Sequence, residues 1–268
     1  MSDLPPWVRD VENQARGNLV LLVEGDSDVV LFRHFLTQHR PGWDVRLHIA
    51  PAKGKSRVVT GVTVHRPGWI GVIDLDEWSP DELREAVARS PRLRALPRFC
   101  IESYFCSPME LWRALPHVQR SRVNDDPQKL TGQIVAALPD WVAHGAMWRV
   151  LRQLHQTARL PTQLENEPVT DEVEIRRILQ TWHDQLAPDK VIEQYHQVID
   201  IAKQLSQDEQ LTRHVHGKKF YSQVVVPILN HLFSQQGADD WLQRFRDEKM
   251  QPPQDLRELL DWILGFIA

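Results

Sequence analysis

The chain of 268 residues contains only two cysteines, Cys100 and Cys106. One pair is too few for a disulfide framework or for the four-ligand sites that hold structural zinc. The sequence also lacks any apolar stretch of about eighteen residues, the length needed to cross a bilayer. Its N-terminus has neither the basic nor the apolar segment of a secretory signal. We therefore expect a cytoplasmic protein with reduced thiols and no membrane partner.

Several nucleotide-binding and metalloprotease motifs are also missing. The basic loop at 51–57, Pro-Ala-Lys-Gly-Lys-Ser-Arg, does not have the Gly-x-x-x-x-Gly-Lys spacing of a P-loop. The apolar run at 19–23 is not followed by a Gly-x-Gly-x-x-Gly fingerprint, which disfavours a dinucleotide-binding fold. No His-x-x-x-His pair stands beside a glutamate, which argues against a zincin. Any step driven by ATP would therefore need a second chain.

What the sequence does contain is carboxylates placed directly after apolar runs. The runs are Leu-Val-Leu-Leu-Val at 19–23 and Trp-Ile-Gly-Val-Ile at 69–73. Short runs of this kind are typical of strands buried in a parallel sheet. The acids that follow them are Glu24 and Asp28 after the first run, and Asp74 and Asp76 after the second. Since parallel strands end at one edge of the sheet, where α/β proteins bind ligands, these acids are expected to meet.

Clustered carboxylates predict a site for a divalent cation. Mg²⁺ prefers oxygen ligands, usually one or two carboxylates with waters and phosphates. Acids that lie close together repel one another unless a cation neutralises them. The ordinary alternative is that Glu24 and Asp28 stand at a strand end and at a helix N-terminus, where acids are favoured without any metal. Two motifs that both follow apolar strands favour the metal site.

The pattern Glu-Gly-x-x-Asp after a first strand, with Asp-x-Asp after a later one, resembles the TOPRIM domain. That fold is shared by topoisomerases, bacterial primases and OLD-type nucleases. The resemblance implies that Glu24 is a catalytic residue, which acts in acid–base chemistry or in metal binding. It also implies that Asp28, Asp74 and Asp76 bind Mg²⁺, with Mn²⁺ as an alternative ion, against a phosphodiester.

Two further segments narrow the resemblance. Residues 99–104, Phe-Cys-Ile-Glu-Ser-Tyr, resemble a segment of OLD-type nucleases in which the glutamate, here Glu102, is another metal ligand. Ser103 stands where that family commonly has Asn. Residues 214–220, His-Val-His-Gly-Lys-Lys-Phe, resemble a His-Gly-Lys segment of TOPRIM-like proteins from phage-defence operons. This subgroup includes the effector nuclease of the PARIS system, and the resemblance implies that Lys218 assists catalysis.

The same resemblance implies partners. Effectors of this subgroup work with an ATPase of the ABC or SMC type, so we expect such a partner and a role in antiviral defence by abortive infection. The substrate is expected to be a nucleic acid. The sequence does not decide between DNA and RNA, including tRNA, because a site that contacts only phosphates does not distinguish the two. A homodimer is also left open.

The net charge of −4 is unevenly distributed, because the N-terminal part of the sequence has an excess of basic residues. Positions 33 to 66 carry seven Lys or Arg against one acid, and positions 84 to 98 carry five arginines against one acid. Positions 162 to 210 reverse the balance, with eleven acids against four bases. Charge runs are commonly solvated surface, but a basic surface around acidic motifs suits a phosphodiester enzyme. The candidate nucleic-acid contacts are Lys53, Lys55, Arg57, His216 and Lys219.

The alternation of apolar runs and helical patterns predicts an α/β fold. We expect a TOPRIM-like domain over 15–116, with a mostly parallel sheet flanked by helices. A mainly helical region over 117–268 is expected to return residues 214–220 to the active-site edge. A helix at 26–38 and a second strand at 44–50 are predicted. The buried face of that helix is expected to contain Val29, Val30, Phe32, Phe35 and Leu36.

The leading functional prediction is a Mg²⁺-dependent nuclease. A topoisomerase needs a tyrosine nucleophile in an adjoining domain, and none of the three tyrosines stands in such a context. A primase needs zinc and nucleotide-selecting modules, which are absent. The alternative from another class is a non-catalytic, TOPRIM-like regulatory or nucleic-acid-binding subunit. Trp78 follows the Asp-x-Asp pair and can stack on a base, although packing in the core is the commoner role of tryptophan.

Overall fold

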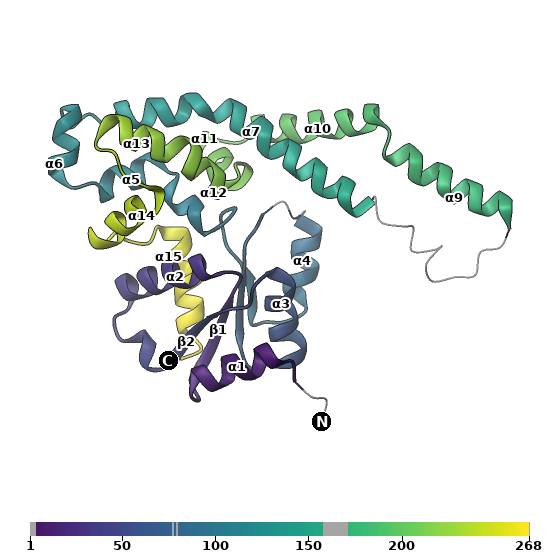
Figure 1. Cartoon of the computed structure of the whole chain (residues 1–268), viewed down its shortest axis with the longest axis horizontal. Coiled ribbons are helices and arrows are strands. Elements are labelled where there is room, and N and C mark those ends of the chain that lie inside the picture. Colours follow the sequence, from purple (N-terminus) through teal and green to yellow (C-terminus); the bar gives the residue numbers. More distant parts are fainter. Residues whose placement is uncertain (1–3, 77, 79, 158–170, 268) are drawn as a thin grey trace.

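The computed structural model describes residues 4–76, 78, 80–157 and 171–267. Its strands are β1 (Leu19–Val23), β2 (Leu47–Pro51), β3 (Ile70–Ile73) and β4 (Leu93–Ala95). Its helices are α1 (Pro6–Ala15), α2 (Asp26–His39), α3 (Lys55–Thr60), α4 (Pro80–Ala88), α5 (Pro108–Ala114), α6 (His117–Arg120), α7 (Gln128–Thr157), α9 (Glu172–Gln185), α10 (Pro188–Lys203), α11 (Gln207–Glu209), α12 (Gly217–Phe220), α13 (Val226–Leu232), α14 (Ala238–Asp247) and α15 (Gln254–Leu264). Figure 1 shows the sheet at one end of the molecule and most of the later helices above it.

The strands of the described chain form one parallel sheet in the order β2-β1-β3-β4. β1 lies in the middle, with Leu22 opposite Ala50 of β2 on one side and Gly71 of β3 on the other. Every residue of β3 is buried, and β1 is buried from its second residue onward, as expected for strands covered on both faces. The predicted α/β class, with a parallel sheet flanked by helices and a helical C-terminal region, is confirmed.

Alternate side chains of β1 belong to two different cores. Leu21 and Val23 share a cluster with buried residues of α2 and α15. Val20 and Leu22 share the other cluster with buried residues of α1 and α3. This division follows from the two-residue period of a strand. In Figure 1, α2 and α15 lie on one side of the sheet and α3 on the other.

Helices from both ends of the chain therefore complete the sheet domain. α1 begins before the predicted boundary at residue 15, and α15 belongs to the region 117–268 that was predicted to be mainly helical. Leu256, Leu260 and Ile263 of α15 face this core, and each is 0% exposed. The two parts of the chain are thus interleaved rather than joined end to end.

The helix predicted at 26–38 is present as α2, but one residue of its expected buried face is wrong. Val30 is 44% exposed, and Leu31 is buried in its place. The buried positions after it are Phe32, Phe35 and Leu36, which gives the three-and-four spacing of a helix packed on one side.

The second strand begins later than predicted. Residues Trp43–Val45 form a single turn of 3-10 helix, and β2 starts only at Leu47. Gly42 precedes the turn with a φ of 83°, a conformation that favours glycine. Trp43 is buried there and donates a hydrogen bond from Nε1 to Thr37 Oγ1 at 3.1 Å. Burial of this indole against α2 explains why the apolar pattern at 44–50 does not start as a strand.

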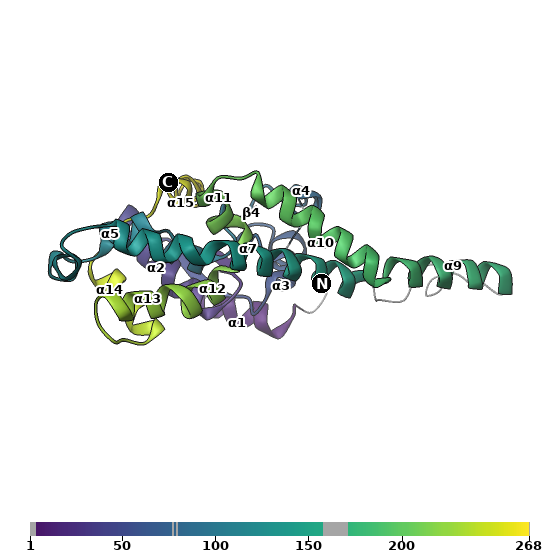
Figure 2. The ribbon, with the colours of Figure 1, turned by 90° about the horizontal axis from the view of Figure 1, so that it is seen from above.

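Within the helical region, α9 lies apart from the other helices. α10 packs along α7, and Figures 1 and 2 both show α9 extending away from the rest of the molecule. The segment at 164–168 that was predicted as a hinge lies outside the described residues. None of the described helices is both long enough and apolar enough to span a membrane.

A buried arginine joins the sheet domain to the helical region. Arg98, in the loop after β4, has a side chain only 7% exposed. It donates two hydrogen bonds to Glu110 of α5, at 2.7 and 2.8 Å, and one from Nε to Asp255 of α15 at 2.8 Å. Its guanidinium also lies 4.3 Å from the ring centre of Tyr104. One cation thus holds the loop after β4 and the nearby α5 to α15, whose Asp255 is 157 residues away in the sequence.

Replacing this arginine should destabilise the protein strongly. Arg98→Ala leaves Glu110 and Asp255 with no cation, and breaking a buried ion pair typically costs about 3–5 kcal/mol. Urea unfolding followed by circular dichroism would measure the loss. The matched control is Arg177→Ala, which removes an exposed pair with Glu174 within α9 and should change stability little. Equal effects of the two substitutions would show that the Arg98 network is not important for stability.

Candidate metal centre

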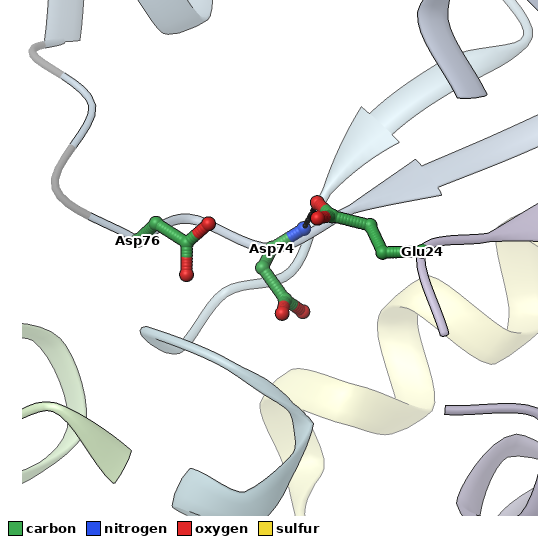
Figure 3. Close-up of side chains that lie close together, drawn as sticks. All are labelled: Glu24, Asp74 and Asp76. Atoms are coloured by element: carbon green, nitrogen blue, oxygen red, sulfur yellow. Dashed lines mark hydrogen bonds between the residues drawn. The ribbon is translucent and has the colours of Figure 1, made fainter. Parts of the chain in front are cut away.

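Three acids meet at the carboxyl edge of the sheet. Glu24 directly follows β1, Asp74 directly follows β3, and Asp76 comes two residues later. One carboxylate oxygen from each lies within 4.8 Å of the others, and all three side chains are partly buried. Figure 3 shows Asp74 between Glu24 and Asp76. The structure therefore brings together the acids of the two sequence motifs, in an arrangement that can hold one divalent cation.

Backbone hydrogen bonds fix the positions of these acids. The N–H of Asp74 donates to Oε1 of Glu24 at 2.8 Å, as drawn in Figure 3. The N–H of Asp76 donates to the carbonyl of Phe99 at 2.8 Å. Asp76 has a φ of 46°, in the left-handed region that non-glycine residues rarely adopt. The strained turn places its carboxylate beside Asp74, and such strain is common at functional sites.

Lys55 lies inside the acidic cluster. Its Nζ is 2.6 Å from Oδ2 of Asp76 and 3.7 Å from Oε1 of Glu24, and its side chain is 11% exposed. The turn before it contains Lys53 and Gly54 with φ values of 64° and 124°, and this turn directs the chain back towards β1. The sequence predicted Lys55 as a surface contact to nucleic acid. That role stays a prediction, and the structure adds that the ammonium group lies against the acids themselves.

Asp28 and Glu102 do not join the three-acid group, although the sequence predicted both as metal ligands. Among the described residues, only Glu24, Asp74 and Asp76 form a group with ligand atoms so close together. Asp28 instead accepts a hydrogen bond from the N–H of Gly25 at 2.8 Å and so caps α2. Both acids are buried, and their charges contribute to the raised pKa of Asp74. They form a second row of acids within electrostatic reach of the metal centre.

Burial raises the pKa values of the clustered acids. The pKa of Glu24 rises to about 7, because the loss of water outweighs the opposing effects of Lys55 and of the Asp74 N–H. Burial also raises the pKa of Asp28 to about 6 and that of Asp74 well above its usual value, and repulsion from Asp28 adds to the latter. Without a further cation, the cluster holds protons near neutral pH.

The segment at 214–220 lies against the Glu102 segment. Gly217 packs so closely on Ser103 and Cys100 that a Cβ at this position would collide with both. The ring of His216 lies 5.2 Å from that of Phe99. Lys218 is exposed on α12, and within the described part of the chain it forms no ion pair with the acids of the cluster. Its catalytic role stays a prediction.

The other predicted nucleic-acid contacts have varied partners. Lys53 pairs with Asp26 at 2.5 Å on the surface. Arg57 lies 6.0 Å from the ring of Trp7. The ammonium of Lys219 lies 4.2 Å from the ring centre of Trp148.

Sequence reasoning missed a contribution from α7. Arg152 pairs with Glu82 of α4 at 3.0 Å and lies 5.4 Å from the ring centre of Trp78. Lys55 lies 4.7 Å from the same ring. The sequence pattern that could have indicated this contribution is the spacing of Trp148 and Arg152. The two are four residues apart and so share one face of a helix.

The raised pKa values predict how stability depends on pH. Glu24 has a pKa of 4.5 when unperturbed and about 7 in the folded protein, so the folded state binds more protons between these values. The free energy of unfolding of the metal-free protein should therefore fall as the pH rises from about 4.5 to about 7. Urea titrations in EDTA across this range would measure the slope. Glu24→Gln should flatten it, whereas Asp26→Asn, which removes an exposed acid of the same edge, should not. An unchanged slope in Glu24→Gln would contradict the prediction.

Lys55 should compete with a metal ion for the acids. In Lys55→Met the apolar stem is kept and the charge is lost, so Mn²⁺ should raise the melting temperature more than it does in the wild type. Thermal unfolding with and without Mn²⁺ would measure the two shifts. Lys53→Met, whose ammonium pairs with Asp26 outside the cluster, is the control and should behave like the wild type. A smaller shift in Lys55→Met would show instead that Lys55 orders the metal ligands.

Comparison of the chain with family models, with curated proteins and with solved structures finds no match. The functional assignment therefore depends on the sequence motifs and on the geometry of the site. Of these, the strongest observation is the meeting of Glu24, Asp74 and Asp76 at the carboxyl edge of a parallel sheet.

Proposed function

We propose that the protein is a TOPRIM-like nuclease that uses Mg²⁺ or Mn²⁺ to hydrolyse phosphodiesters of DNA or RNA. The observation that carries this proposal is the three-acid group, in which the carboxylates of Glu24, Asp74 and Asp76 lie within 4.8 Å of one another. Their order along the chain follows the TOPRIM pattern. Buried acids with few cations nearby are unfavourable, so a divalent ion suits this donor set.

The residues of the site have separate roles in this proposal. Asp74 and Asp76 would hold the ion, which when bound would activate a water and stabilise negative charge on the phosphate. Glu24, with a pKa of about 7, is suited to accept a proton near neutral pH. Lys55 already lies beside two of the acids and provides a fixed positive charge for the phosphate. Lysine fits that role as a compact charge on a long stem.

The proposal also includes a biological setting, which depends on the resemblance of residues 214–220 alone. In that setting the nuclease is the toxic effector of an anti-phage system in the cytoplasm. An ATPase of the ABC or SMC type controls it, since the chain has no P-loop of its own. The close packing of Gly217 on Ser103 supports a link between this segment and the site.

A non-catalytic regulatory subunit is the second candidate, and Lys55 is the observation that favours it. Nζ of Lys55 lies 2.6 Å from Asp76, so the acids already have one internal cation. A cluster neutralised in this way can persist as a structural element after catalysis is lost. Metal binding without cleavage of any nucleic acid would be the signature of such a protein.

The nuclease activity should depend on Asp74. Purified wild-type protein should cleave plasmid DNA, tRNA or single-stranded oligonucleotides when Mg²⁺ or Mn²⁺ is present, and EDTA should stop the reaction. Asp74→Asn should lower the rate by a factor of about 10²–10³, as loss of one electrostatic stabiliser typically does. Gel assays at matched protein concentration would measure this.

The control for that assay is Asp26→Asn, which removes an exposed acid that pairs with Lys53 near the same sheet edge. It should cleave at the wild-type rate. Equal cleavage by Asp74→Asn and wild type would mean that the activity comes from a contaminant. Calorimetric binding of Mn²⁺ without cleavage of any of the three substrates would favour the regulatory subunit.

A further inference from the structure

One face of α7 carries a row of aromatic and cationic side chains. Trp141, His144, Trp148 and Arg152 follow one another at spacings of three and four residues, which places them on one side of the helix. The ring centres of Trp141 and His144 are 5.2 Å apart, and those of His144 and Trp148 are 6.1 Å apart. Trp148 donates a hydrogen bond from Nε1 to Nε2 of His144 at 2.8 Å, which fixes the orientation of the indole.

α12 adds a lysine and a histidine to this row. The ammonium of Lys219 lies 4.2 Å from the ring centre of Trp148, which is the distance of a cation–π contact. His216, the residue before α12, lies 6.1 Å from Trp148 and 5.2 Å from Phe99. Trp148 is therefore bordered by groups that attract phosphate and by rings that suit a base.

The row continues to the metal centre. Arg152 is one helical turn beyond Trp148 and lies 5.4 Å from the ring centre of Trp78. Lys55 lies 4.7 Å from the same ring and 2.6 Å from Asp76. Cations thus alternate with tryptophans from α12 to the three-acid group, with Arg152 placed beside Trp148 by helical spacing and also paired with Glu82.

The tryptophans of this row are not the ones that fill the core. Trp241 is 0% exposed and Trp43 is 6% exposed, and both are packed among apolar side chains. Trp78 and Trp148 are partly exposed and lie next to cations, and one side of Trp78 also packs against the core that contains Val20 and Leu22. The exposed part of an indole that lies beside a cation can contact a ligand.

We propose that this row, defined as Trp148, Lys219, Arg152, Trp78 and Lys55, binds an unpaired strand of nucleic acid and leads its backbone to the acids. The inference rests on the proposed nuclease function and names its substrate class. Binders of single strands combine a basic track for phosphates with aromatic rings on which bases stack, and they need no particular sequence. A duplex keeps its bases stacked on one another, so it cannot use the rings.

Lys219 has two positions in this proposal. In the structure its ammonium lies 4.2 Å from the centre of the Trp148 ring. When a base stacks on the indole, the flexible lysine stem lets the ammonium move to the neighbouring phosphate. The alternation of cations and rings therefore matches the alternation of phosphates and bases along a strand.

Binding can be measured without cleavage, in Asp74→Asn protein with EDTA. The probes are a fluorescent single-stranded oligo(dT) or oligo(U) and a fluorescent hairpin duplex, followed by anisotropy. The single strands should bind more tightly than the duplex. Trp148→Ala should weaken single-strand binding by about tenfold, which is the range of one base stacked on an aromatic ring. Trp148→Phe should keep most of the affinity, because it keeps a ring.

The matched control is Trp262→Ala. Trp262 is also partly exposed and has Arg94 4.6 Å from its ring centre, but it belongs to α15. This variant should bind as Asp74→Asn alone does. Equal losses in Trp148→Ala and Trp262→Ala, or tighter binding of the duplex, would overturn the inference. Thermal unfolding of each variant checks that it is folded.

The outcome for binding and the outcome for catalysis are separable. If Trp148→Ala loses single-strand affinity while wild-type protein cleaves nothing, the row is a binding site and the nuclease proposal fails. If wild-type protein cleaves nucleic acid but Trp148→Ala binds single strands as tightly as its parent, the nuclease stands and the row does not bind the substrate.

Discussion

Repulsion among buried acids at one edge of the sheet is the constraint that the surrounding structure satisfies. Glu24, Asp74 and Asp76 share a small space, and Asp28 and Glu102 add negative charge behind them. Such a group is unfavourable unless positive charge or hydrogen-bond donors reach it. Lys55 supplies the charge, and backbone N–H groups after β1 and β3 supply donors. The negative charge that remains unneutralised is the kind of charge that a divalent cation can balance.

The helical region takes part in this arrangement instead of standing apart from it. The loop from β4 to α5 carries Phe99, whose carbonyl holds Asp76, and Arg98, whose guanidinium reaches α5 and α15. Gly217 packs on the same segment from the other side. A shift of the helices would therefore move the Phe99 carbonyl and with it Asp76. This connection couples the packing of the helices to the position of Asp76.

Local patterns were enough to predict β1 and β3 and the meeting of Glu24, Asp74 and Asp76 at the edge of the sheet. Apolar runs at 19–23 and 69–73 can only be buried as central strands, and the acids after them have one edge to share. The start of β2, the exposure of Val30 and the partner of Lys55 could not be read in this way. Each depends on a neighbour distant in sequence, such as α2 for Trp43, or on a turn of positive φ such as the one before Lys55. Spacing along a chain does not encode such turns.

The return of α15 to the sheet has a consequence for how the protein folds. Leu256, Leu260 and Ile263 complete the core beside α2, and Asp255 completes the partners of Arg98. Contacts between segments so distant in sequence form slowly. The loop after β4, whose Phe99 carbonyl holds Asp76, therefore reaches its final position only after α15 has packed on the sheet. We expect the acidic edge to be among the last parts of the molecule to order during folding.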